Sequence, residues 1–123
     1  MKKGTFLITV IAATLTFNCS NNSEDDLTDV SPVQQGELIT YTEHIKPIID
    51  NNCVFCHDNP PVNGAPNSLV NYQDVKASAE NNLLDRISRQ ASESGAMPLG
   101  GPRLPQNSID LVQQWIADGL LEN

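Results

Sequence analysis

The residue types best suited to chemistry in this chain lie together at Cys53-Val54-Phe55-Cys56-His57. Two thiols separated by two residues and followed at once by an imidazole form the C-x-x-C-H pattern of covalent haem attachment. In a helical turn this spacing places both sulfurs at one edge of a porphyrin, where they add across its two vinyl groups. The next residue then offers a ring nitrogen to the iron as proximal ligand. We therefore expect one covalent haem c, held by Cys53, Cys56 and His57.

Two other interpretations use the same thiols. C-x-x-C also serves thiol–disulfide exchange, but those proteins carry it after a strand in a βαβ unit. No segment here alternates clearly between apolar and polar residues, as a strand would. A zinc site would need a fourth ligand beside the two thiols and His57, and Asp58 or His44 could supply it only in an irregular way. Neither alternative fits the pattern as well as haem attachment.

A helix is expected to lead into the motif. Thr40 with Glu43 fits a capping box at its start. Apolar residues then recur every four positions as one stripe, at Ile45, Ile49 and Cys53. Pro47 must lie in about the first turn, because further along it would kink the helix.

Three further helices follow in the sequence. Asn71 with Asp74 can cap a helix over 72–79, and another begins at Leu83. The last helix should run over about 105–118, where a following glycine ends it. We expect an all-α domain.

From the motif onward the chain resembles a small monohaem c-type cytochrome, that is, a class I-like cytochrome c domain. The resemblance covers residues 39–123 and rests on the motif, on Met97-Pro98, and on the closing pattern Leu104…Ile109…Trp115-Ile116…Gly119. It implies four or so short helices around one covalently attached haem. It also implies that the first helix packs against the last, with Ile45 or Ile49 near Trp115 or Ile116.

The resemblance further implies an axial ligand on the other face of the haem. Met97 is the only methionine besides Met1, and it follows His57 by 40 residues in a loop rich in glycine and proline. A thioether sulfur is a soft ligand that favours ferrous iron and raises the reduction potential. The alternative is a methionine that fills a gap in the core. We expect His57 and Met97 to be the two metal ligands.

Four other features are expected to have supporting or neutral roles. His44 is expected to be a solvated surface histidine. A backbone carbonyl within 58–67 should orient His57 through its other ring nitrogen. Arg86 and Arg103 are candidate partners for the haem propionates, with a plain surface charge as the alternative for each.

A filled sixth position suits electron transfer, because the iron then changes charge with little reorganisation. We therefore expect a single-electron carrier and not an enzyme. The alternative is an accessory or haem-based sensor cytochrome whose sixth ligand is labile.

The beginning of the chain is typical of an exported protein. Lys2 and Lys3 precede a short apolar run, which predicts a signal peptide over residues 1–18; a retained anchor helix is the alternative. Leu15-Thr16-Phe17-Asn18-Cys19 resembles a bacterial lipoprotein processing site, with Asn18 where such sites prefer a small residue. Haem attachment uses two of the three cysteines, and lipidation would give the third, Cys19, a role. An unprocessed signal cysteine and an intermolecular disulfide are the alternatives.

Residues 19–38 are expected to form a lipidated cysteine followed by a disordered acidic tether, because they contain few large apolar residues. After removal of the signal peptide, five of the seven basic residues remain against 15 acidic ones. Such a charge argues against nucleic acid as a partner and favours a redox protein with a basic docking face, although it would also serve solubility. We expect a location in the cell envelope, in the periplasm or at the outer membrane, with membrane contact through the lipid.

Overall fold

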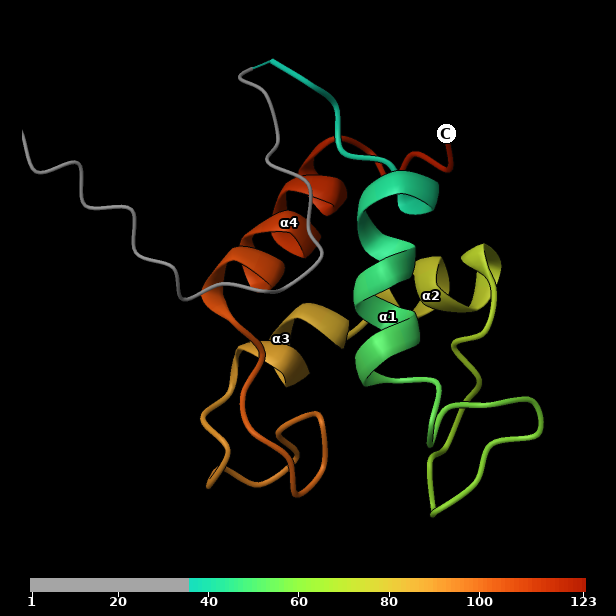
Figure 1. The fold of residues 1–123 in the computed structure, drawn as a ribbon, viewed down its shortest axis with the longest axis vertical. Helices are drawn as coiled ribbons and strands as arrows, with labels where there is room; N and C mark the ends of the chain where they lie inside the picture. The colour runs from blue at the N-terminus through green and yellow to red at the C-terminus, as the bar shows by residue number, and fades with distance from the viewer. Residues whose placement is uncertain (1–35) are drawn as a thin grey trace, which may run out of the picture.

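The computed structural model describes residues 36–123, so the expected signal peptide, the lipidated Cys19 and the expected tether as far as residue 35 lie outside the described residues. The helical elements are η1 (Tyr41–Ile45), α1 (Lys46–Asn52), α2 (Tyr72–Ala79), α3 (Leu83–Ser88) and α4 (Gln106–Ala117) (Figure 1). The described part of the chain contains no strand, apart from an isolated parallel bridge between Thr40 and Leu121. The all-α class is therefore confirmed. Within 36–123 no helix combines the length and apolarity needed to cross a membrane.

The first helix begins differently from its expected form. Its first turn, η1, is a π-helix, in which Ile45 N–H donates to Thr40 O at 3.3 Å. The expected capping box is wrong, because the Thr40 hydroxyl is buried without a hydrogen-bond partner and forms no cap. Pro47 lies in the first turn of α1, as required. A proline ring clashes with the carbonyl four residues before it in a regular helix, and the wider π turn eases that contact.

The later helices follow the sequence signals closely. The side chain of Asn71 accepts from Asp74 N–H at 3.0 Å and caps α2, as expected. Asn82 occupies the corresponding position before α3 but makes no side-chain cap. At the end of α4, Gly119 has a φ of +94°, a conformation that glycine adopts at little cost. Leu120 N–H donates to Trp115 O at 2.9 Å, which completes a Schellman motif.

The helices enclose one core. η1 contacts α4, α4 contacts α3, and α3 contacts α2. The first helical segment therefore packs against the last one, which confirms that expectation, and Trp115 is fully buried. The largest fully buried side chains are Trp115, Ile39, Ile45, Ile49, Val75 and Val112.

Two ends of the molecule can be distinguished in Figure 1. At one end, which we call the terminal end, residues 36–45 meet residues 117–123. Tyr41 N–H donates to Leu121 O there, and Thr42 N–H donates to Glu122 O. At the opposite end, which we call the motif end, lie the loops 53–71 and 89–105. The two loops that carry the candidate haem ligands therefore lie at the same end of the fold.

Candidate haem-binding site

The C-x-x-C-H motif forms one additional turn after α1. Cys53 N–H donates to Ile49 O at 2.8 Å, and His57 N–H donates to Cys53 O at 2.9 Å. The spacing of four residues in both bonds is that of an α-helical turn, while the backbone of Cys53, with a φ of −122°, marks the end of α1 itself. Cys53, Cys56 and His57 are all partly exposed. The turn thus collects the three predicted residues in one place.

The two thiols are free and differ in their surroundings. Neither cysteine of the described chain forms a disulfide. Cys53 packs against the core, and burial raises the pKa of its thiol from 9.0 to about 11. Cys56 lies 3.6 Å from Asn63 Nδ2, which donates to its sulfur. The raised pKa lowers the fraction of Cys53 that is present as the nucleophilic thiolate at a given pH.

His57 is held in one orientation by the loop that follows it. Its Nδ1 lies 2.8 Å from Asn67 O, which confirms the expected carbonyl within 58–67. Leu69 N–H donates to His57 O at 2.8 Å, so the loop is attached to the main chain of the same residue. An Nδ1–H that donates to a carbonyl leaves Nε2 as the ring nitrogen with a free lone pair. Nε2 makes no hydrogen bond within the described residues.

Met97 belongs to the second loop at the motif end. Its side chain is partly buried and packs against the core. Its N–H donates to Arg86 O at 3.0 Å, and the preceding Ala96 is buried. The main chain of the loop is therefore hydrogen-bonded to the last turn of α3 at Met97 itself. The motif and Met97 share no helix, and only the arrangement of the two loops brings them to one end of the molecule.

Three arginines hold this loop by donating to main-chain carbonyls. Arg86 Nη1 donates to Gly95 O at 3.1 Å, Arg89 Nη1 donates to Ser94 O, and Arg103 Nε donates to Ser88 O at 3.0 Å. The haem-propionate role suggested for Arg86 and Arg103 stays a prediction. Their present contacts give both residues a structural role that the sequence did not indicate.

Large apolar side chains are exposed beside these ligands. Phe55 is 84% exposed, Leu99 is 76% exposed and Val62 is 43% exposed. All three lie in the loops of the motif end. Scattered exposed apolar residues are common, but here they accompany the motif and the Met97 loop.

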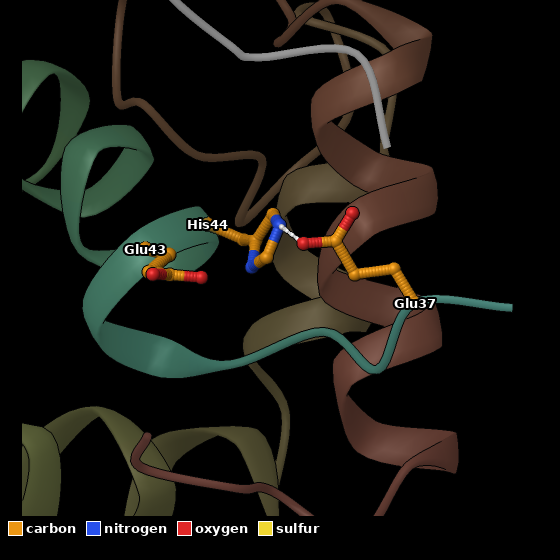
Figure 2. A group of neighbouring side chains, drawn as sticks. All are labelled: Glu37, Glu43 and His44. Carbon is orange, nitrogen blue, oxygen red and sulfur yellow. Dashed lines mark ion pairs between the residues drawn. The ribbon is translucent and has the colours of Figure 1, made fainter. Parts of the chain in front are cut away.

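The expectation for His44 is wrong, because its exposed fraction is 6%. Its Nδ1 accepts from Thr40 N–H at 3.2 Å, and its Nε2 lies 3.8 Å from Glu37 Oε1. The chain before η1 folds back beside the imidazole and covers it (Figure 2). His44 lies in η1 at the terminal end, and the motif lies beyond the far end of α1 (Figure 1).

Glu37, Glu43 and His44 bring ligand-type atoms within 4.8 Å of one another, and in Figure 2 the two carboxylates lie on opposite sides of the imidazole. A neutral imidazole that binds a metal through one nitrogen carries its proton on the other. Because Nδ1 accepts a hydrogen bond, the proton of neutral His44 is on Nε2. Neither ring nitrogen of His44 is then free to bind a metal. The arrangement is that of a buried, hydrogen-bonded histidine and not that of a preformed metal site.

Sequence reasoning missed Asn67 as the partner of His57 and the role of the arginines in holding the Met97 loop. Asn67 acts through its backbone carbonyl, which every residue type possesses, so no residue signal marks it.

Comparison with protein-family models, with curated proteins and with solved structures finds no match to this chain.

Proposed function

We propose that this protein is a small c-type cytochrome that carries single electrons at the bacterial cell envelope. One observation carries the proposal: the C-x-x-C-H turn presents two free thiols and a histidine whose Nδ1 is held by Asn67 O. That hydrogen bond selects the tautomer in which Nε2 can bind iron. The all-α fold, with the Met97 loop at the same end as the motif, supports the finer assignment of a cytochrome c fold.

The residues present fit a covalent haem. Cys53 and Cys56 would form the two thioethers, and His57 would supply the proximal nitrogen. Met97 would supply the distal sulfur from the second loop. The exposed Phe55, Val62 and Leu99 offer apolar surface beside these groups, which a large flat apolar cofactor would cover in part.

Each residue then has a separate task in electron transfer. Bound haem supplies one iron centre that alternates between ferrous and ferric states. The Asn67 carbonyl, by accepting from Nδ1, keeps the His57 ring in a fixed orientation. The Met97 sulfur would stabilise the ferrous state and keep other ligands from the sixth position. A protein with both positions filled passes electrons without binding a substrate.

The first experiment measures haem attachment. We expect the mature protein, made in a strain with working cytochrome maturation, to carry the mass of one haem after denaturation. Cys53→Ala and Cys56→Ala should each weaken attachment, and His57→Ala should mainly impair maturation and ligation. A mature chain without the added mass would refute the proposal and would favour thiol–disulfide exchange or a zinc site.

The second experiment addresses Met97. The oxidised protein should show the weak near-infrared charge-transfer band that the resemblance to methionine-ligated cytochromes implies, and Met97→Ala should remove it. Met97→Ala should also open the iron to carbon monoxide and lower the potential, while Met97→His keeps six-coordination and lowers the potential. Rapid binding of carbon monoxide by the native ferrous protein would favour a sensor over a carrier.

The proposal extends to export, with lipid on Cys19 and a redox partner that presents a basic face. Cys19→Ser should release the domain in soluble form. If that variant stays with the membrane and the native protein carries no acyl mass, the lipid anchor is wrong. Weaker electron exchange at high salt would support the charged partner, because screening reduces attraction between opposite charges.

A further inference from the structure

We propose that Arg86 is a positioning residue that holds Met97 in place for the iron, by fixing the loop on both sides of Ala96. The inference rests on the proposed function and deepens it, because it names what controls the sixth ligand. Arg86 would act on Met97 through the loop backbone and not as a partner of the haem propionates.

Arg86 contacts the Met97 loop twice. Its carbonyl accepts from Met97 N–H at 3.0 Å, and its Nη1 donates to Gly95 O at 3.1 Å. The two bonds bracket Ala96, which is 6% exposed. A segment bound on both sides of a buried residue has little freedom to shift, so the backbone at Met97 is held in place relative to α3.

Gly95 makes the close approach of the guanidinium feasible. Its φ is +77°, and a Cβ at this position would lie 1.8 Å from Arg86 Nη1. Any other residue would therefore be strained and would also displace the arginine. The absence of a side chain at Gly95 thus leaves the space that the Arg86 guanidinium occupies.

The neighbouring arginines hold other parts of the same loop. Arg89 also donates to Asp85, and its loop contact is Ser94 O, one residue further from Met97. Arg103 holds Ser88 O at the opposite edge of the loop. Of the three, Arg86 makes the contacts nearest to Met97, so its loss should affect the sixth ligand most.

The energetic consequence concerns ligand exchange. Methionine is a weak ligand on ferric iron, and its dissociation frees the sixth position for an added ligand. A hydrogen bond from a charged donor that is partly buried stabilises the closed loop by more than an exposed one would. Without the Arg86 side chain, the loop should open more often, and Met97 should leave the iron more often.

The test uses the ferric holoprotein and imidazole as the added ligand. The rate of imidazole binding at saturating concentration reports the opening of the Met97 loop. We expect Arg86→Met, which keeps the length and removes the donors, to raise this rate about ten- to hundredfold, as expected for the loss of a hydrogen bond from a charged donor. Arg86→Lys should lie between native and Arg86→Met, and Arg89→Met should have a smaller effect.

Two controls separate this role from charge and from propionate binding. Lys46→Met makes the same change in net charge at an exposed side chain at the start of α1, away from the motif end, and should leave the rate unchanged. Arg86→Met should have no further effect on imidazole binding in the Met97→Ala background, where no methionine has to leave. Arg86→Lys keeps the test possible if Arg86→Met fails to fold.

An unchanged imidazole rate in both Arg86 variants, with the native near-infrared band intact, would overturn the positioning role alone. An equal change of the rate with and without Met97 would also overturn it and would favour the propionate role. A native protein without the near-infrared band would instead refute Met97 as ligand in the proposed function.

Discussion

The terminal end and the motif end of this small fold are built on opposite principles. Next to the terminal end, Tyr41 packs with Tyr72 of α2 and Trp115 of α4, with ring centroids 5.4 to 6.5 Å apart, and the indole is fully buried. At the motif end, Phe55 and Leu99 stand mostly in solvent. The chain therefore packs three aromatic rings together near the terminal end, although Leu38 there is 59% exposed, and leaves Phe55 and Leu99 uncovered at the motif end.

Hydrogen bonding differs between the two ends in the same way. At the terminal end, Trp115 Nε1 donates to Leu121 O at 2.8 Å and the Tyr72 hydroxyl donates to Leu120 O at 2.7 Å. Polar atoms of the aromatic side chains thus anchor the last residues of the chain to the core. At the motif end, arginines and a histidine ring bind loop carbonyls, and no aromatic ring packs between the two loops in the described contacts. The comparison supports the proposal that the motif end binds haem, while the contacts at the terminal end stabilise the fold.

The largest effect should come from truncating the indole. Trp115→Ala removes a fully buried side chain and its hydrogen bond to Leu121 O, and should lower the free energy of unfolding by about 3–5 kcal/mol. Urea unfolding of the holoprotein, followed by circular dichroism, measures the loss.

Phe55→Ala is the matched aromatic truncation at the motif end. Its ring is 84% exposed in the protein chain itself, so even with partial cover by haem the cost should be about 1 kcal/mol, well below that of Trp115→Ala. Equal losses in the two variants would show that bound haem buries Phe55 as deeply as the core buries Trp115, and the contrast between the two ends would then fail.

Two tyrosines at the terminal end provide a smaller and sharper test. Tyr72→Phe removes a hydrogen bond to Leu120 O and should cost about 1 kcal/mol of stability. The Tyr41 hydroxyl is buried without a partner, so Tyr41→Phe should be neutral or slightly stabilising. The same urea titrations measure both variants. A loss for Tyr41→Phe as large as for Tyr72→Phe would mean that the Tyr41 hydroxyl is bound to water.

The last test concerns the pH dependence of the motif before haem attachment. Burial raises the pKa of Cys53 to about 11 from 9.0, so the folded state binds its proton more tightly than the unfolded chain does. The associated stability is fully present below pH 9.0 and is lost as pH rises through about 11. In haem-free protein made without residues 1–18, alkylation of Cys53 should keep rising with pH beyond 9.0.

Peptide mass spectrometry follows that alkylation, with urea-unfolded protein as the control. In urea the alkylation of Cys53 should level off near its ordinary pKa of 9.0. Identical pH profiles in the folded and unfolded protein would contradict the burial of this thiol.

Much of the helical architecture follows from local sequence, because its signals act within a few residues. The Asn71 cap, the prolines at the start of two helices and the Schellman glycine at position 119 all act through neighbouring backbone groups. The bounds of α2 were predicted correctly for this reason. The C-x-x-C-H turn belongs to the same class, since its three residues come together within one turn of the chain.

Tertiary structure alone decided the features that depend on distant segments. His44 looked like a surface residue beside Glu43 and Lys46, but the chain before η1 folds back and buries it. Asn67 and Gly95 act through carbonyl oxygens, which carry no residue signature. Local sequence therefore determines which groups can do chemistry in this protein. Packing between segments far apart in the chain determines which of them are buried, which are oriented and which are left exposed, because those properties depend on neighbours that local sequence does not specify.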